Sequence, residues 1–106
     1  MDENKIVETT YSEQGEITDA CILSYAVETN GYHGGDGGHG GYLMLTFTND
    51  GGASMAAAVN TSPSDPEEIT DIDSDGSVVI KMSGDAEIRT MSFALRKIAD
   101  FLEKIL

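Results

Sequence analysis

Apolar residues near the C-terminus recur with the spacing of one face of an α-helix, and this pattern constrains the fold more than any other. They fall at alternating steps of three and four residues, at Ile88, Met91, Leu95, Ile98, Leu102 and Ile105. Asp85, after Gly84, is the expected N-cap, and Lys104 lies in the last turn, where a cation is favoured. The pattern predicts a helix over residues 86–105, although its first residues, "EIRTMS", can also extend as a strand. Such an apolar face needs another element to cover it.

The sequence before this segment has the pattern of β-strands. Short apolar runs at 20–29, 42–49, 53–59 and 77–83 are partly β-branched or aromatic, and turn-forming residues bound them. Residues 5–11 form a weaker first strand. We expect an α+β fold: an antiparallel β-meander of four to six strands with one C-terminal amphipathic helix packed on one face. Residues 1–106 are expected to form a single domain.

Two short segments predict tight turns between these strands. "NDGG" (49–52) is the strongest hairpin signal, because Asp-Gly tolerates the positive φ of a primed turn. "DSDG" (73–76) can join 68–72 to 77–83 in the same way.

Negative charge is concentrated in the predicted strands. The net charge is −13; residues 1–80 hold fifteen Asp and Glu with one base, Lys5, and residues 81–106 hold five bases with four acids. Such a field repels nucleic acid and anionic membranes and attracts basic partners. Direct nucleic-acid binding and membrane binding are therefore disfavoured, and a basic protein is the expected partner.

Cys21 is the single cysteine, so no internal disulfide forms, and its apolar surroundings predict a buried thiol. The acidic first residues lack the apolar core of a signal peptide. No apolar run approaches the roughly 20 residues that span a bilayer. We therefore expect a cytoplasmic protein.

A glycine-rich segment, residues 30–41, is expected to form a long hairpin loop between two strands. Seven of its residues between 31 and 41 are glycine. Such loops are uncommon and often functional. His33, Asp36 and His39 could hold a metal ion such as zinc. Alternatively, the loop becomes ordered on a partner, with Tyr32 and Tyr42 as anchors at its rims. It contains no Lys or Arg and leads into a strand, which argues against a phosphate site.

An Asp-rich turn at 71–76 begins like a calcium-binding EF-hand loop. Asp71, Asp73 and Asp75 have the spacing of the first three ligands. Met82 replaces the final bidentate Glu, and strands rather than helices flank the turn. A weak Ca²⁺ site remains one alternative, and a hairpin turn whose carboxylates bond local amides is the other.

No catalytic motif is present, so we expect a non-enzymatic protein. Its acidic strand face and loop would occupy the basic groove of a nucleic-acid-binding protein, imitating a row of phosphates. The expected contact residues are Tyr32, His33, Asp36, His39, Tyr42, Glu67, Glu68, Asp71, Asp73 and Asp75.

In size and charge the chain resembles small phage-encoded inhibitors of host nucleases, a resemblance of composition that no motif carries. The charge split and the long loop lead us to expect an inhibitor or accessory factor, and no cofactor is expected. The alternative is a small metal-binding domain that uses the glycine-rich loop, with Zn²⁺ or Ca²⁺ as its ion. A homodimer formed through the C-terminal helix is a further possible association.

Overall fold

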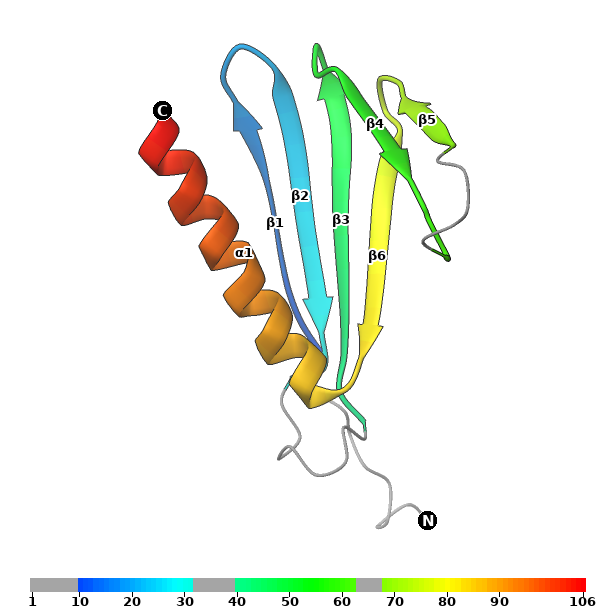
Figure 1. The fold of residues 1–106 in the computed structure, drawn as a ribbon, viewed down its shortest axis with the longest axis vertical. Helices are drawn as coiled ribbons and strands as arrows, with labels where there is room; N and C mark the ends of the chain where they lie inside the picture. The colour runs from blue at the N-terminus through cyan, green and yellow to red at the C-terminus, as the bar shows by residue number, and fades with distance from the viewer. Residues whose placement is uncertain (1–9, 32–39, 63–67) are drawn as a thin grey trace. The chain divides into compact units, whose positions relative to one another are not determined.

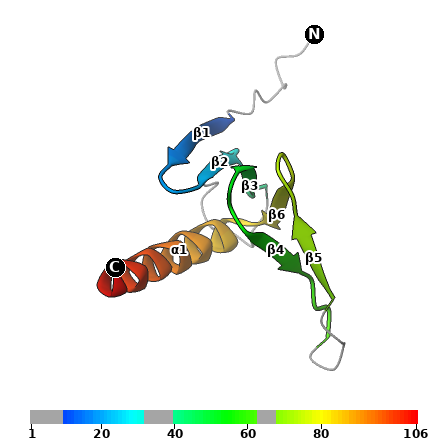
Figure 2. The same ribbon diagram turned by 90° about the horizontal axis from the view of Figure 1, so that it is seen from above.

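The parts of the chain that the computed structural model describes, residues 10–31, 40–62 and 68–106, form strands followed by a helix (Figure 1). The elements are β1 (Tyr11–Thr18), β2 (Ile22–Thr29), β3 (Tyr42–Gly51), β4 (Met55–Ala58), β5 (Ile69–Ile72), β6 (Ser77–Ser83) and α1 (Asp85–Ile105). Strands β1, β2, β3 and β6 form an antiparallel sheet in that order. Strands β4 and β5 form a second, two-stranded sheet, which Figure 2 shows from above. The α+β class with one C-terminal helix is confirmed.

The chain divides into two compact units. Unit 1 comprises Met1–Ser12, Glu28–Met44 and Lys81–Leu106, and unit 2 comprises Glu13–Val27 and Leu45–Ile80. Each strand of the larger sheet contributes residues to both units. The two units are described separately below.

Unit 1 contains α1 and the strand ends that surround its first turn. The N-cap of α1 is Gly84, so the predicted N-cap role of Asp85 is wrong. Asp85 is instead the first helical residue and is 1% exposed. The Gly84 N–H donates to the Gly41 carbonyl oxygen at 2.6 Å. A side chain at residue 41 would overlap Asp85 Oδ1 and come within 3.3 Å of Ile88 Cδ1. Glycine at position 41 therefore allows the helix start to lie close to β3.

The apolar face of α1 is half-buried over its first two turns and more exposed beyond them. Ile88 and Met91 are half-buried, whereas Leu95 is 39%, Ile98 is 56% and Leu102 is 47% exposed. Cover is therefore described for the start of the stripe, within unit 1. Helical periodicity specifies which residues share a face, but it does not specify what covers that face.

Unit 2 is organised around Asn49, which is 3% exposed. Its side-chain amide donates to the carbonyl oxygens of Ala53 at 2.7 Å and Ile72 at 2.9 Å, and its Oδ1 accepts from the Gly51 N–H at 3.1 Å. Its backbone N–H donates to the Gly76 carbonyl oxygen at 2.9 Å. One asparagine thus joins the end of β3 to the segments that lead into β4 and out of β5.

The hairpin predicted at "NDGG" is wrong. Strand β3 continues to Gly51, and positive φ values at Gly51 and Gly52, 154° and 76°, turn the chain toward β4. Strand β4 then pairs with β5, in the register Met55↔Ile72 and Ala58↔Ile69. Local turn chemistry favours a bend here, but the pairing partner is chosen by contacts distant in sequence.

The turn predicted at "DSDG" is present, but the expected pairing is wrong. The Gly76 N–H donates to the Asp73 carbonyl oxygen at 2.8 Å, and Asp75, with φ of 71°, takes the left-handed position. Asp is among the residues that tolerate this conformation. The turn does not join a paired hairpin, because β5 pairs with β4 and β6 pairs with β3.

Strand β1 was not expected from the sequence. The predicted first strand, residues 5–11, falls largely outside the described residues, and β1 begins at Tyr11. The polar sequence "YSEQGEIT" has little intrinsic preference for a strand. Pairing with β2 stabilises its extended conformation instead. The ring of Tyr25 on β2 occupies the space beside Gly15, where a Cβ would come within 2.8 Å of ring atoms.

The thiol of Cys21 is exposed, so its predicted burial is wrong. Cys21 lies in the turn between β1 and β2, one residue before the apolar strand begins. Within the described ranges, no helix combines the length and apolar character needed to cross a membrane.

Candidate partner-binding site

The two ends of the glycine-rich loop are joined by hydrogen bonds within unit 1. Asn30 is 6% exposed; its side-chain amide donates to the Gly40 carbonyl oxygen, and its Oδ1 accepts from the Tyr42 N–H at 2.8 Å. Thr29 Oγ1 donates to the Tyr42 carbonyl oxygen at 2.6 Å and accepts from the Gly31 N–H at 3.0 Å. We call this set of bonds the loop clasp. It fixes where the loop leaves β2 and where it enters β3.

Tyr42 is the predicted loop residue that the structure places. It is half-buried in β3, and its hydroxyl donates to Glu28 Oε2 at 2.7 Å. The bond holds the ring beside the clasp and leaves a second carboxylate oxygen on Glu28 for another donor. The remaining loop predictions, Tyr32, His33, Asp36 and His39, lie outside the described residues, and so does Glu67.

Unit 2 carries the acidic side chains that the sequence singled out. Glu68, Asp71, Asp73 and Asp75 are exposed. Asp71 lies opposite Ala56 in the β4–β5 sheet, and a methyl group covers little of a neighbouring carboxylate. The small alanines of β4 therefore leave the acidic edge of β5 accessible.

A hollow of about 460 Å³ adjoins this edge. Its polar lining includes Asp71, Asp73, Ser54, Ser74 and the buried Asn49. Two carboxylates and two hydroxyls supply acceptors for cationic donors, and a guanidinium group has the fork geometry to use them. This hollow includes two of the acidic residues predicted from the sequence, Asp71 and Asp73.

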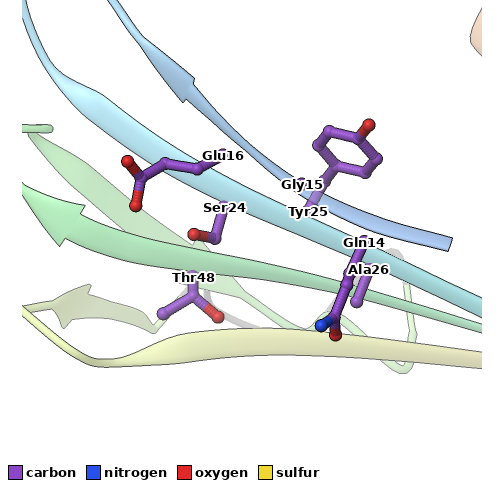
Figure 3. Close-up of a pocket in the computed structure, with 7 residues that line it drawn as sticks. All are labelled: Gln14, Gly15, Glu16, Ser24, Tyr25, Ala26 and Thr48. Carbon is purple, nitrogen blue, oxygen red and sulfur yellow. The ribbon is translucent and has the colours of Figure 1, made fainter.

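A second hollow of about 420 Å³ lies over β1, β2 and β3 in unit 2 (Figure 3). Glu16, Ser24 and Thr48 from the three successive strands line it. Ser24 Oγ donates to Asp50 Oδ2, and the Tyr25 hydroxyl donates to Glu13 Oε2 at 3.3 Å. Of its lining side chains Glu16 is acceptor-only, whereas the amide of Gln14 and the three hydroxyls can both donate and accept.

The described residues contain no group of three His, Cys, Asp or Glu side chains arranged to hold a metal ion. Asp71, Asp73 and Asp75 therefore do not converge as EF-hand ligands do. Asp71 belongs to strand β5, and a strand spaces side chains along a line instead of wrapping them around an ion. The three loop residues proposed for Zn²⁺ lie outside the described ranges.

The described polar side chains of unit 2 include a bonded Ser–Asp pair. Ser24 Oγ is bonded to Asp50, and both histidines of the chain fall outside the described residues. The described carboxylates of unit 2 accept hydrogen bonds and attract cations.

Sequence reasoning missed Asn30 and Asn49, the two buried asparagines on which both regions depend. Each ends an apolar run and precedes glycine or Asp-Gly, so each resembles an ordinary turn residue. The position of each asparagine in the sequence was the available signal. An asparagine at the end of a strand, just before a turn, can form hydrogen bonds to backbone groups on both sides of that turn. Comparison of the chain with protein-family models, with curated proteins and with solved structures finds no match.

Proposed function

We propose that this protein is a non-enzymatic binding protein that engages a basic, nucleic-acid-binding protein in the cytoplasm, as an inhibitor or accessory factor. The observation that carries the proposal is the charge of unit 2, which contains ten Asp and Glu and no Lys, Arg or His. The rest of the chain has a net charge of −3, since the whole carries −13. The sequence of unit 2 therefore has no basic side chain that could neutralise its carboxylates.

The exposed carboxylates support recognition of Lys and Arg side chains. Seven of the described acids in unit 2 are exposed: Glu13, Glu16, Asp19, Glu68, Asp71, Asp73 and Asp75. A surface with one sign of charge speeds the encounter with a partner of opposite sign and rejects nucleic acid and anionic membranes. A protein that binds phosphate backbones has the complementary surface.

The β5 hollow is the proposed anchor for one partner arginine. Its two carboxylates can accept a guanidinium in a bidentate manner, and the buried Asn49 fixes the chain segments around them. Arginine is also the basic residue most enriched at interfaces.

The glycine-rich loop is the proposed second contact, through Tyr32, His33, Asp36 and His39. The loop clasp holds its two ends, and Tyr42 at the rim presents a ring whose hydroxyl is already bonded to Glu28. Fixed ends reduce the chain entropy lost when a loop closes on a partner.

The test is capture of the partner from a lysate of the native host, followed by measurement of its dissociation constant across a salt series. We expect affinity to fall steeply as salt rises, and a nucleic acid to compete for the same partner. The double variant Asp71→Asn/Asp73→Asn should weaken binding about tenfold or more at low salt. Its matched control, Asp100→Asn/Glu103→Gln, removes the same charge from α1 and should bind almost normally.

Three results would contradict the proposal. The first is the absence of any basic partner at low salt. The second is a complex whose affinity ignores salt. The third is an equal loss of affinity in the two double variants, because that would make total charge, rather than the acidic edge of β5, the source of binding.

A further inference from the structure

The loop clasp of unit 1 contains a chemically reactive dipeptide, Asn30–Gly31. Among the asparagines of the chain Asn30 alone precedes glycine, because Asn4, Asn49 and Asn60 precede Lys, Asp and Thr. A side-chain amide can be attacked by the backbone nitrogen of the residue that follows it. Glycine favours this attack, since it has no side chain to obstruct the approach and its backbone is the most flexible. The sequence therefore places the most reactive asparagine of the chain inside the clasp.

The fold requires both residues of this dipeptide. Gly31 has a φ of 88°, and a Cβ there would lie 2.9 Å from Cε2 of Tyr11, closer than a van der Waals contact. The Asn30 amide supplies the clasp with a donor to Gly40 and an acceptor for Tyr42. An ionised Asp side chain would lack the donor. All of these residues belong to unit 1. The reactive pair therefore cannot be replaced without loss to the clasp.

The closed clasp engages every group that would react. The leaving nitrogen, Asn30 Nδ2, donates to the Gly40 carbonyl oxygen, and Asn30 Oδ1 accepts from the Tyr42 N–H at 2.8 Å. The attacking group, the Gly31 N–H, donates to Thr29 Oγ1 at 3.0 Å. Reaction requires the Asn30 side chain to turn from residues 40 and 42 toward its own backbone. That movement breaks bonds of the clasp, so the reaction proceeds from a locally opened state.

We propose that Asn30–Gly31 is a deamidation site that reacts when the loop clasp opens, and that its products weaken the clasp irreversibly. The Gly31 nitrogen bonds to Asn30 Cγ, the Cγ–Nδ2 bond breaks, and the amide nitrogen leaves as ammonia with the Gly31 proton. Solvent water then opens the five-membered imide, giving aspartate by addition at Cγ or isoaspartate by addition at the backbone carbonyl carbon. Aspartate turns a carboxylate oxygen toward the Gly40 carbonyl oxygen, and isoaspartate lengthens the main chain by one carbon atom.

The test is incubation of the full chain in native buffer and in urea, with conversion at each asparagine followed by mass-spectrometric peptide mapping. Wild-type Asn30 should react at least about tenfold more slowly in native buffer than in urea. Thr29→Val keeps the branched shape but removes both bonds of Thr29 Oγ1, so the native rate should rise about fivefold or more while the rate in urea stays unchanged. Thr46→Val, at a half-buried threonine of β3 outside the clasp, is the matched control and should react like the wild type.

Hydrogen exchange tests the effect of the products on the clasp. Asn30→Asp stands for the aspartyl product, and its Tyr42 N–H should exchange about fivefold or more faster than in the wild type. Asn60→Asp adds the same charge at an exposed position and should leave that exchange unchanged. Circular dichroism verifies that the variants are folded. The proposal is overturned by equal wild-type rates in native buffer and urea, by faster reaction of another asparagine in urea, by a folded Thr29→Val that reacts no faster, or by unchanged Tyr42 exchange in Asn30→Asp. None of these measurements involves a partner, so they are independent of the proposed function.

Discussion

Replacement of Asn49 by alanine should destabilise the protein more than any exposed substitution of the same kind. The side chain is 3% exposed and makes three hydrogen bonds, to Ala53, Ile72 and Gly51. A typical hydrogen bond contributes about 0.5–1.5 kcal/mol net, and a buried group left without its partner costs about 1–3 kcal/mol. Ala53 and Ile72 are half-buried, so water can replace part of the hydrogen bonding that their carbonyl oxygens lose. We expect the free energy of unfolding to fall by about 2–4 kcal/mol.

That loss is large relative to the total stability of about 5–15 kcal/mol that small domains have. For a domain of this size, each kcal/mol corresponds to a melting-temperature change of roughly 4–8 °C. The Asn49→Ala variant should therefore melt at least about 10 °C below the wild type. Urea unfolding followed by circular dichroism gives the free energy, and tyrosine fluorescence is a second probe because the chain has no Trp.

Two further variants separate the hydrogen bonds from other effects. Asn60→Ala removes an exposed asparagine and should change the free energy of unfolding by no more than about 0.5 kcal/mol. Asn49→Asp keeps the shape but turns a carboxylate oxygen toward two carbonyl oxygens, so it should be at least as destabilising as alanine. Equal stabilities for Asn49→Ala and Asn60→Ala would refute the assignment of Asn49 as the organising residue of unit 2.

Three other predictions follow from the described geometry. Gly41→Ala should lower the free energy of unfolding by about 1–3 kcal/mol in urea unfolding, because a Cβ there overlaps the buried Asp85; wild-type stability would contradict this account. Cys21 should react with a thiol reagent in native buffer as fast as in urea, and strong protection would show that the thiol is covered. The metal-binding alternative requires millimolar Zn²⁺ or Ca²⁺ to raise the melting temperature, and for Zn²⁺ the rise must disappear in His39→Ala; no shift with either ion removes that alternative.

Elements with strong local patterns could be predicted from the sequence. The run "SVVIKMS" matches β6 residue for residue, and the three-and-four spacing located α1 to within one residue at its start. In both cases the identity of consecutive side chains is sufficient, because periodicity reports directly on the backbone conformation that gathers the apolar residues.

Elements that depend on distant pairing could not be predicted. "NDGG" has the residues of a tight hairpin, yet β4 pairs with β5 because Met55 and Ile72 meet across a stretch of chain that no local pattern encodes. Strand β1 is polar and exists through its pairing with β2. Helical spacing likewise gathers Ile98 and Leu102 on one face of α1 without specifying what covers that face.

The acidic part of the candidate site could be predicted, but the residues that support it could not. Glu68, Asp71 and Asp73 stand out by their charge and turn context. Asn49 and Asn30 do not, since their roles depend on carbonyl groups brought near them by the fold. Side-chain to backbone hydrogen bonds of this kind can be identified from a three-dimensional structure, because they depend on the positions of both partners.

Thr29 and Asn30 form hydrogen bonds to Gly40 and Tyr42. Because of these bonds, the arrangement of β2 and β3 does not depend on the length of the loop that connects them. With the two ends already joined, a change in the number of intervening residues alters closure entropy slowly, by roughly 0.6 kcal/mol for each doubling. Evolution or an experimenter can therefore rewrite residues 32–39, or insert a foreign peptide there, while β2 and β3 keep their register.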